Sequence, residues 1–379
     1  MKQKTKSNID TTRCNLYLSS GFPDMVDIID KSNEFLAVIA ARGVGKTVSG
    51  VGALDTIAKR DSLEFPYCFF MRRTAAIMDE LMNPLLNPFN KANQCVGTSL
   101  FPDKLGKSSY AIYDLPQYDG KQSPSVAAAG QTPAMIGAPL STIANIRGFS
   151  TPSIKYILYD EAVPEKSQRN TIKDEGDALD NAYETINRNN KLEGLPEVKF
   201  IALANNNNIF KSEIAYRWGL IEAINYMETN NVEQYHDDDA CLSVIFLKRS
   251  PISEAKKDTA LYKRNRRLNH NGSESFTDMA ISNTSRFDAS NVRQCVLTEY
   301  RPLFRVGALY IYKHKSRDEY FATFKKTGTF KYEYEFTPKD TIAILDRFAY
   351  LRYCYIANES VFFESAIANV VFEKIFDIK

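Results

Sequence analysis

The most informative part of the chain reads Phe35-Leu36-Ala37-Val38-Ile39-Ala40-Ala41-Arg42-Gly43-Val44-Gly45-Lys46-Thr47-Val48-Ser49. Its apolar first part, from Phe35 to Ala40, predicts a buried parallel strand. Gly43 and Gly45 let backbone N–H groups turn towards a phosphate, and the amino end of the helix that follows adds positive potential. The stretch therefore predicts a strand, a phosphate-binding loop and a helix in direct succession.

The loop carries residue types that hold a nucleotide. Lys46 would reach the β- and γ-phosphates of ATP, and Thr47 would ligand Mg²⁺. We expect the nucleotide to be bound by Arg42, Gly43, Val44, Gly45, Lys46 and Thr47. The full motif has glycine seven residues before the threonine, where this chain has Ala40, a difference of one methyl group. The alternative is an ordinary turn between a strand and a helix, which would not need the lysine.

A later apolar run, residues 154–159, ends in the carboxylate pair Asp160-Glu161. This is the arrangement called Walker B, in which Asp160 would hold Mg²⁺ through water and Glu161 would polarise the attacking water. Acidic pairs also end strands by chance. The position of this pair, about 110 residues after the phosphate loop, favours the catalytic interpretation.

Two further apolar runs end in polar side chains. Residues 198–204 predict a strand that ends at Asn205, whose amide could contact the γ-phosphate or its water; an asparagine-rich turn is the alternative. Residues 66–71 predict a strand that runs into Arg72-Arg73, which could face nucleotide or DNA because ligands lie beyond the carboxyl ends of such strands. Solvated loop arginines would explain that pair equally well.

The predicted helix over residues 177–190 buries one face and leaves Arg188 near its carboxyl end. A cation there complements the helix dipole, which is its simplest role. A guanidinium at this place could also reach the site of a neighbouring subunit and act as an arginine finger.

The composition is that of a globular chain with a sizeable core: 379 residues, of which 44% are hydrophobic. The net charge is only +2, so nucleic-acid contacts must come from local clusters. Six widely spaced cysteines and three histidines argue against a structural zinc site. There is no signal peptide and no long apolar run, so we expect a soluble intracellular protein with reduced thiols and no membrane partner.

Three domains are expected. Residues 1–225 alternate strands with helices and predict an α/β sheet, with residues 95–150 forming a surface hairpin and long loops. Residues 226–285 form a linker or lid whose basic run could hold a phosphate backbone or be a solvated helix. That run contains Lys256, Lys257, Lys263, Arg264, Arg266 and Arg267. Residues 286–379 predict an α+β domain with antiparallel strands at 295–298, 303–312, 320–324 and 329–336, then helices at 341–356 and 360–376.

The order of these motifs resembles that of the DNA-packaging ATPases, or encapsulation proteins, of small short-tailed phages (podoviruses). That family is a branch of the terminase large subunits and of the additional-strand, catalytic-glutamate (ASCE) P-loop ATPases. The resemblance covers about residues 30–215, and further on it rests on layout and length. Within it, Arg147 falls where such ATPases carry a trans-acting basic residue.

The resemblance implies an ATP hydrolase that uses Mg²⁺ and translocates double-stranded DNA into a procapsid. It implies a homo-oligomeric ring, a pentamer, at the portal vertex in the host cytoplasm, with the portal and a packaging RNA as partners. It also implies a C-terminal domain that resembles an RNase-H-type nuclease without its active site. Only Glu299 lies near the expected metal-facing position of the first strand, so no nuclease activity is expected.

Two other functions remain open from the sequence. One is a full terminase that both cuts and packages DNA, which a metal-stimulated cut of linear DNA would favour. The other is a nucleotide-gated DNA-binding scaffold without turnover, which a turnover lost in Glu161→Gln would exclude.

Overall fold

The computed structural model describes residues 9–40, 44–106, 109–142, 153–163, 172, 175–188, 190, 194–205, 212–248, 250–251, 255, 293, 295–335, 337–356 and 360–376. The chain forms two compact units, Met1–Ala223 with Asn230–Ser285, and Ile224–Thr229 with Arg286–Lys379. Each unit has its own sheet. No helix in the described ranges is both long and apolar enough to cross a membrane.

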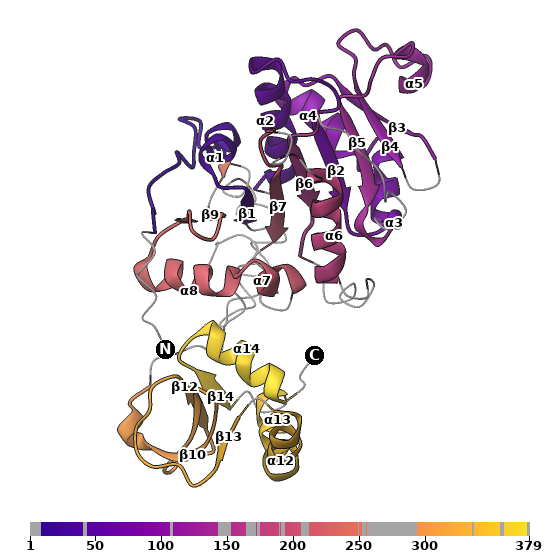
Figure 1. The fold of residues 1–379 in the computed structure, drawn as a ribbon. Coiled ribbons are helices and arrows are strands. Elements are labelled where there is room, and N and C mark those ends of the chain that lie inside the picture. The colour runs from indigo at the N-terminus through magenta and orange to yellow at the C-terminus, as the bar shows by residue number, and fades with distance from the viewer. Residues whose placement is uncertain are drawn as a thin grey trace. The chain divides into compact units, whose positions relative to one another are not determined.

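The first unit is built on a nine-stranded sheet in the order β3-β4-β5-β2-β6-β7-β1-β9-β8 (Figure 1). Six neighbouring strands, from β5 to β9 in that order, run parallel, while β3, β4 and β8 are antiparallel to their neighbours. The predicted α/β class is therefore confirmed. The strands are β1 Phe35–Ala40, β2 Cys68–Arg72, β3 Leu100–Lys104, β4 Tyr110–Asp114, β5 Met135–Pro139, β6 Tyr156–Asp160, β7 Lys199–Asn205, β8 Gln234–Asp237 and β9 Leu242–Leu247.

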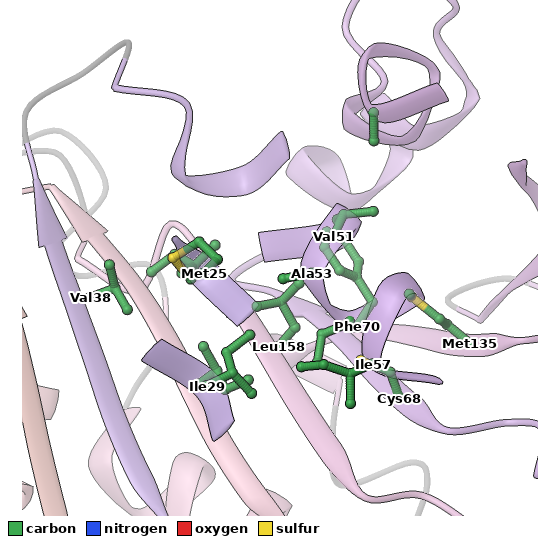
Figure 2. Packing of buried hydrophobic residues seen from close by; sticks show 14 of the residues in the cluster. Met25, Ile29, Val38, Val51, Ala53, Ile57, Cys68, Phe70, Met135 and Leu158 are labelled. Carbon is green, nitrogen blue, oxygen red and sulfur yellow. The ribbon is translucent and has the colours of Figure 1, made fainter. Parts of the chain in front are cut away.

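Helices cover both faces of this sheet, because the buried strands present apolar side chains to both sides. Helices α1, α2 and α4 pack together over one face, where Val51 and Ile57 of α2 meet Phe70 and Leu158 of the strands (Figure 2). On the opposite face, Tyr183 of α6 packs on Phe200. The helices are α1 Met25–Lys31, α2 Lys46–Arg60, α3 Ala75–Met78, the 3₁₀ helix η1 Asp79–Met82, α4 Pro88–Val96, α5 Pro124–Ala127, α6 Glu175–Asn187 and α7 Glu213–Arg217. Helix α8 Leu220–Asn230 contributes residues to both units.

The order of the central strands brings the predicted motifs to one edge. Strand β7 lies between β1, which leads into the phosphate loop, and β6, which carries the acidic pair. In the parallel register Asn205 is opposite Ala40, and Asp160 is opposite Leu203. The carboxyl ends of the three strands therefore lie together, which is where ligands bind in open α/β sheets.

The sheet includes strands beyond residue 225, although the sequence predicts that the α/β domain ends there. Strand β9 pairs in parallel with β1 over its whole length and is fully buried. Strand β8 then forms the edge, antiparallel to β9. The acidic turn at residues 237–239 conceals this pair in the sequence, because it interrupts the apolar pattern between two short strands.

The second unit is an α+β fold, as predicted, around a five-stranded sheet in the order β13-β10-β11-β12-β14. Phe304 of β10 stacks on Phe348 of α12 with ring centroids 4.2 Å apart, in a core that also includes Phe372 of α14. The elements are the 3₁₀ helix η5 Leu297–Glu299, β10 Tyr300–Val306, β11 Leu309–His314, β12 Tyr320–Thr323, β13 Glu333–Tyr334, α12 Pro338–Phe348, α13 Tyr350–Ile356, β14 Val361–Phe363 and α14 Ala366–Ile375.

Several boundaries predicted for this unit were wrong. Residues 297–299 form a 3₁₀ helix rather than part of a strand. The expected strand over residues 303–312 is a hairpin, because the chain turns at Gly307, where φ is +53°. The expected helix over residues 341–356 is two helices, and the segment from 360 begins with β14. The sheet is mixed, since β13 and β14 run parallel to their neighbours.

Candidate active site

The described part of the phosphate loop begins at Val44, which is buried under the amino end of α2. Gly45 caps that helix with φ +95°, a left-handed conformation that glycine adopts without strain. Lys46 and Thr47 are the first two residues of the helix, so their backbone N–H groups belong to its positive end. Arg42 and Gly43, also expected to bind nucleotide, lie outside the described residues.

A cavity of about 300 Å³ opens between this helix end and the ends of strands β2, β6 and β7. It contains most of the predicted nucleotide-site residues and several that were not predicted. The residues that line it are Gly45, Lys46, Thr47, Val48, Arg72, Glu80, Leu86, Pro88, Lys91, Asp160, Glu161, Leu203 and Asn205. The structure thus brings together side chains from five separate segments of the chain.

Lys46 links the loop to two strands. Its Nζ donates to the carbonyl oxygen of Ala40 at 2.9 Å and to Oδ1 of Asn205 at 3.1 Å. The side chain is 9% exposed, so the ammonium group is held at the cavity wall rather than in bulk solvent. This places a cation and an amide side by side where phosphate oxygens would lie.

Thr47 and Asp160 are joined by a hydrogen bond of 2.8 Å from the threonine hydroxyl to Oδ1 of the carboxylate. Hydroxyl and carboxylate oxygens are hard ligands of the kind that Mg²⁺ prefers. Asp160 is only 2% exposed, yet it lines the cavity. The residues present therefore fit a magnesium ion held between the helix end and strand β6.

Glu161 follows Asp160 in quite different surroundings. Its side chain is exposed and lines the cavity. Its φ of +59° is left-handed, which is rare for a residue with a side chain. The next residue, Ala162, donates its backbone N–H to the carbonyl oxygen of Leu203 at 2.9 Å and so ties this sharp turn to β7. The carboxylate can thus meet a small molecule in the cavity.

Arg72 and Arg73, which the sequence does not distinguish, have separate environments. Arg72 lines the cavity and is paired with Asp160. Arg73 does not line it; its Nη1 lies 2.6 Å from Oε1 of Glu175, and Tyr159 donates to the same oxygen at 3.1 Å. Arg73 is 1% exposed, so this second pair is part of the core. Arg72 is the last residue of β2, whereas Arg73 lies just beyond the strand.

A second, larger cavity of about 700 Å³ adjoins the first. The two share Gly45, Val48 and Lys91. Most of its other lining residues are apolar or small: Leu18, Ser20, Phe22, Pro23, Asp24, Met25, Val26, Ser49, Gly52, Ala53, Thr56, Cys95 and Val96. The sequence does not reveal this cavity, since its walls come from three separate segments and only one of them, at Gly45 and Val48, belongs to the phosphate-loop motif.

The remaining predicted residues lie apart from both cavities or outside the described residues. Arg188 directly follows α6, is exposed, and lines neither cavity. Arg147 falls outside the described ranges, as does the whole basic run from Lys256 to Arg267. Glu299 lies in η5, where its Oε2 is 3.6 Å from Nε2 of His314 and 3.8 Å from Nη2 of Arg317.

Comparisons with known proteins give matches in structure but not in sequence. No protein-family model matches the chain, and no curated protein matches it. The structure is similar to that of the bacteriophage Phi-29 viral genome packaging motor assembly, with a TM-score of 0.53 and 16% identity over 96% of this chain and 100% of that one. It is also similar to the Phi-28 gp11 DNA packaging motor, with a TM-score of 0.50 and 16% identity over 95% of this chain and 99% of that one. Over nearly its whole length, the chain therefore has the fold of the phage DNA packaging motors.

Proposed function

We propose that this protein is a motor ATPase that hydrolyses ATP to translocate double-stranded DNA into a phage procapsid. The observation that carries the proposal is the meeting of Lys46, Thr47, Asp160, Glu161 and Asn205 around one cavity. The packaging-motor fold of the chain supports it. The strand order supports the additional-strand, catalytic-glutamate class, because β7 stands between the loop strand and the carboxylate strand.

Each residue has a chemical role in this proposal. Lys46 and the amino end of α2 hold the β- and γ-phosphates. Thr47 and Asp160 hold Mg²⁺, which when bound neutralises charge on the transferring phosphoryl group. Glu161 accepts a proton from the attacking water and orients it. Asn205, already hydrogen-bonded to Lys46, senses the γ-phosphate.

The nucleotide base would occupy the larger cavity. That cavity adjoins the phosphate side at Gly45 and Val48, and its walls are mostly apolar. A flat base gains from leaving water for such walls. Lys91 lines both cavities and stands where the two parts of a nucleotide would join.

The assembly proposed is a homopentameric ring at the portal vertex of the procapsid in the host cytoplasm, with the portal and a packaging RNA as partners. Arg188 would reach the site of a neighbouring subunit, and Arg147 would act in trans as well. The basic run from Lys256 to Arg267 would hold the DNA backbone. The C-terminal unit would be an RNase-H-like domain without nuclease activity, in which Glu299 lies close to His314 and Arg317.

The decisive measurement is the ATPase rate with and without double-stranded DNA across a range of protein concentrations. We expect the rate to rise with DNA and with concentration, because a ring completes each site with a neighbour's arginine. Glu161→Gln protein serves as the control for contaminating ATPases. A rate indifferent to DNA would contradict translocation, and no turnover at any concentration would leave a nucleotide-binding scaffold. Cleavage of linear DNA with Mn²⁺ that Glu299→Gln abolishes would instead favour a full terminase.

A further inference from the structure

Arg72, the last residue of β2, has partners at the candidate site that its sequence context does not reveal. Its Nη2 donates to Oδ2 of Asp160 at 3.0 Å. Its Nη1 donates to Oε2 of Glu80 at 2.9 Å and to the carbonyl oxygen of Ile77 at 3.2 Å. The side chain is 5% exposed, so these bonds form in surroundings where charges interact strongly.

The bond to Asp160 completes a clamp on that carboxylate. Thr47 holds Oδ1 and Arg72 holds Oδ2, so both oxygens have a donor and the carboxylate plane cannot rotate without breaking one of the bonds. The donors come from different elements, one from the first turn of α2 and the other from β2, the strand paired with β6.

The guanidinium is itself anchored. Glu80, in η1, and the Ile77 carbonyl, in α3, hold one nitrogen while the other reaches Asp160. Burial alone would lower the pKa of Arg72, but the carboxylates of Asp160, Glu161 and Glu80 outweigh it and leave the pKa raised. The cation therefore stays charged between its partners.

We propose that Arg72 is a positioning residue that fixes Asp160 in the orientation needed to hold Mg²⁺, with Glu80 as its anchor. This inference rests on the proposed function, in which Asp160 is the metal-binding carboxylate. The planar fork of arginine bridges Asp160 and Glu80 at the same time. A lysine ammonium is a compact charge on a flexible stem and lacks the fixed fork that holds both carboxylates in one geometry.

The test is the Mg²⁺ dependence of nucleotide binding, followed with a fluorescent ATP analogue at equilibrium, so that no turnover is required. In Arg72→Lys the Mg²⁺ concentration for half-maximal binding should rise by about 10- to 100-fold, as when residues that orient metal ligands are changed. Binding of the analogue in EDTA should stay within about twofold of wild type. Arg60→Lys is the matched control, since Arg60 also bridges two carboxylates, Asp30 and Asp61, but does not line the cavity.

An unchanged Mg²⁺ dependence in Arg72→Lys would overturn the inference. Weaker binding in EDTA would overturn it too, because Arg72 would then contact phosphate directly. If Arg72→Lys does not fold, Glu80→Gln decides, because Glu80 is 42% exposed and tolerates change. A rise of threefold or more in the Mg²⁺ requirement supports the anchor, and no rise overturns it. Wild-type protein that binds no analogue at all would contradict the proposed function instead.

Discussion

At the scale of single residues, the two neighbouring carboxylates of the site are prepared for different tasks. Asp160 is buried and holds two hydrogen bonds from Thr47 and Arg72. Glu161 is exposed and lines the cavity. A carboxylate held at both oxygens keeps a fixed position towards a cation, whereas one that faces the cavity can take a proton from water. These surroundings support the proposal that Asp160 holds the cation and Glu161 accepts the proton.

Glu161→Gln should separate these two tasks. The amide keeps the shape of the side chain but cannot accept the proton, so turnover should fall by about a hundredfold or more. Nucleotide affinity should stay close to wild type, because Lys46, Thr47 and Asp160 are unchanged. Single-turnover hydrolysis and equilibrium binding would measure the two effects. A variant that hydrolyses ATP at nearly the wild-type rate would remove Glu161 from the mechanism.

Glu161→Gly should be more stable than Glu161→Gln, which loses the same charge but keeps a side chain. The left-handed backbone at this position costs a residue with a side chain about 1 kcal/mol, and glycine adopts it without that cost. Part of the gain is offset by the greater freedom of glycine in the unfolded chain. Denaturant unfolding should therefore give a free energy higher than that of Glu161→Gln. An equal or lower value would show that the turn is not strained.

At the scale of elements, the edge strand β8 contains a buried histidine. His236 Nδ1 lies 2.8 Å from the Ser243 hydroxyl, and Nε2 lies 3.0 Å from Oε1 of Gln234. A neutral ring satisfies both bonds, with Nε2 donating and Nδ1 accepting. Burial, with the nearby Arg13 cation, lowers the pKa of His236 from its usual 6.5 to about 4.

Because of this histidine, we expect the free energy of unfolding to fall at acid pH. Since its folded pKa is below the unfolded value, its stabilising effect is complete above pH 6.5 and is lost as the pH falls towards 4. The loss should reach up to about 3 kcal/mol. Denaturant unfolding across this range, in wild type and in His236→Gln, would measure it. The variant should show a flatter pH dependence, and identical slopes would mean that His236 already titrates normally in the folded protein.

Helix α4 offers a direct test of where the base binds. Cys95 lines the larger cavity and is exposed, and Cys241 is exposed elsewhere in the same unit. Neither forms a disulfide bond. ATP at ten times its dissociation constant should slow alkylation of Cys95 by about tenfold and leave Cys241 unaffected.

Tripolyphosphate is the matched ligand for that experiment, since it would fill the phosphate side alone. Cys95 should then remain as reactive as in the free protein. If ATP binds but Cys95 is not protected, the base lies outside this cavity. Equal protection by tripolyphosphate would indicate a change in the helix rather than direct cover.

The sequence predicts the parts of this site that follow apolar runs. Thr47, Asp160 and Asn205 each stand just after a run that forms a parallel strand, and such strands end at a common edge. The larger cavity could not be predicted, because its walls come from segments that only the fold brings together. The partners of Arg72 and Arg73 could not be predicted either, since Asp160 and Glu175 lie far away in the sequence and only the fold brings them close.

At the scale of the whole molecule, the site on one subunit is predicted to depend on a neighbour. Arg188 is exposed beyond the end of α6 and lines neither cavity of its own chain. Arginine fingers supplied from another subunit accelerate hydrolysis by about a thousandfold or more. Arg188→Ala should therefore bind ATP normally but show little DNA-stimulated turnover.

Mixing two inactive variants distinguishes action in trans from action within one chain. Arg188→Ala subunits keep a site, and Glu161→Gln subunits keep a finger, so mixed assemblies should regain DNA-stimulated turnover. The rate should peak at intermediate ratios. Variants that co-assemble, as judged by size, and still give only the sum of their separate rates would show that Arg188 serves its own subunit or only the helix end.

The register of strand β7 against its neighbours fixes the positions of groups in the candidate site. Each residue of a parallel strand advances by about 3.3 Å. A shift of β7 by one residue would therefore carry Asn205 out of hydrogen-bonding distance of Lys46. It would also turn the Asn205 side chain to the other face of the sheet. The same shift would move Leu203 away from Asp160 in the paired register. A displacement along β7 would therefore break the Lys46–Asn205 hydrogen bond and the Ala162–Leu203 bond that ties the Glu161 turn to this strand. Thr47 and Arg72, which hold Asp160, belong to other elements and would keep their places.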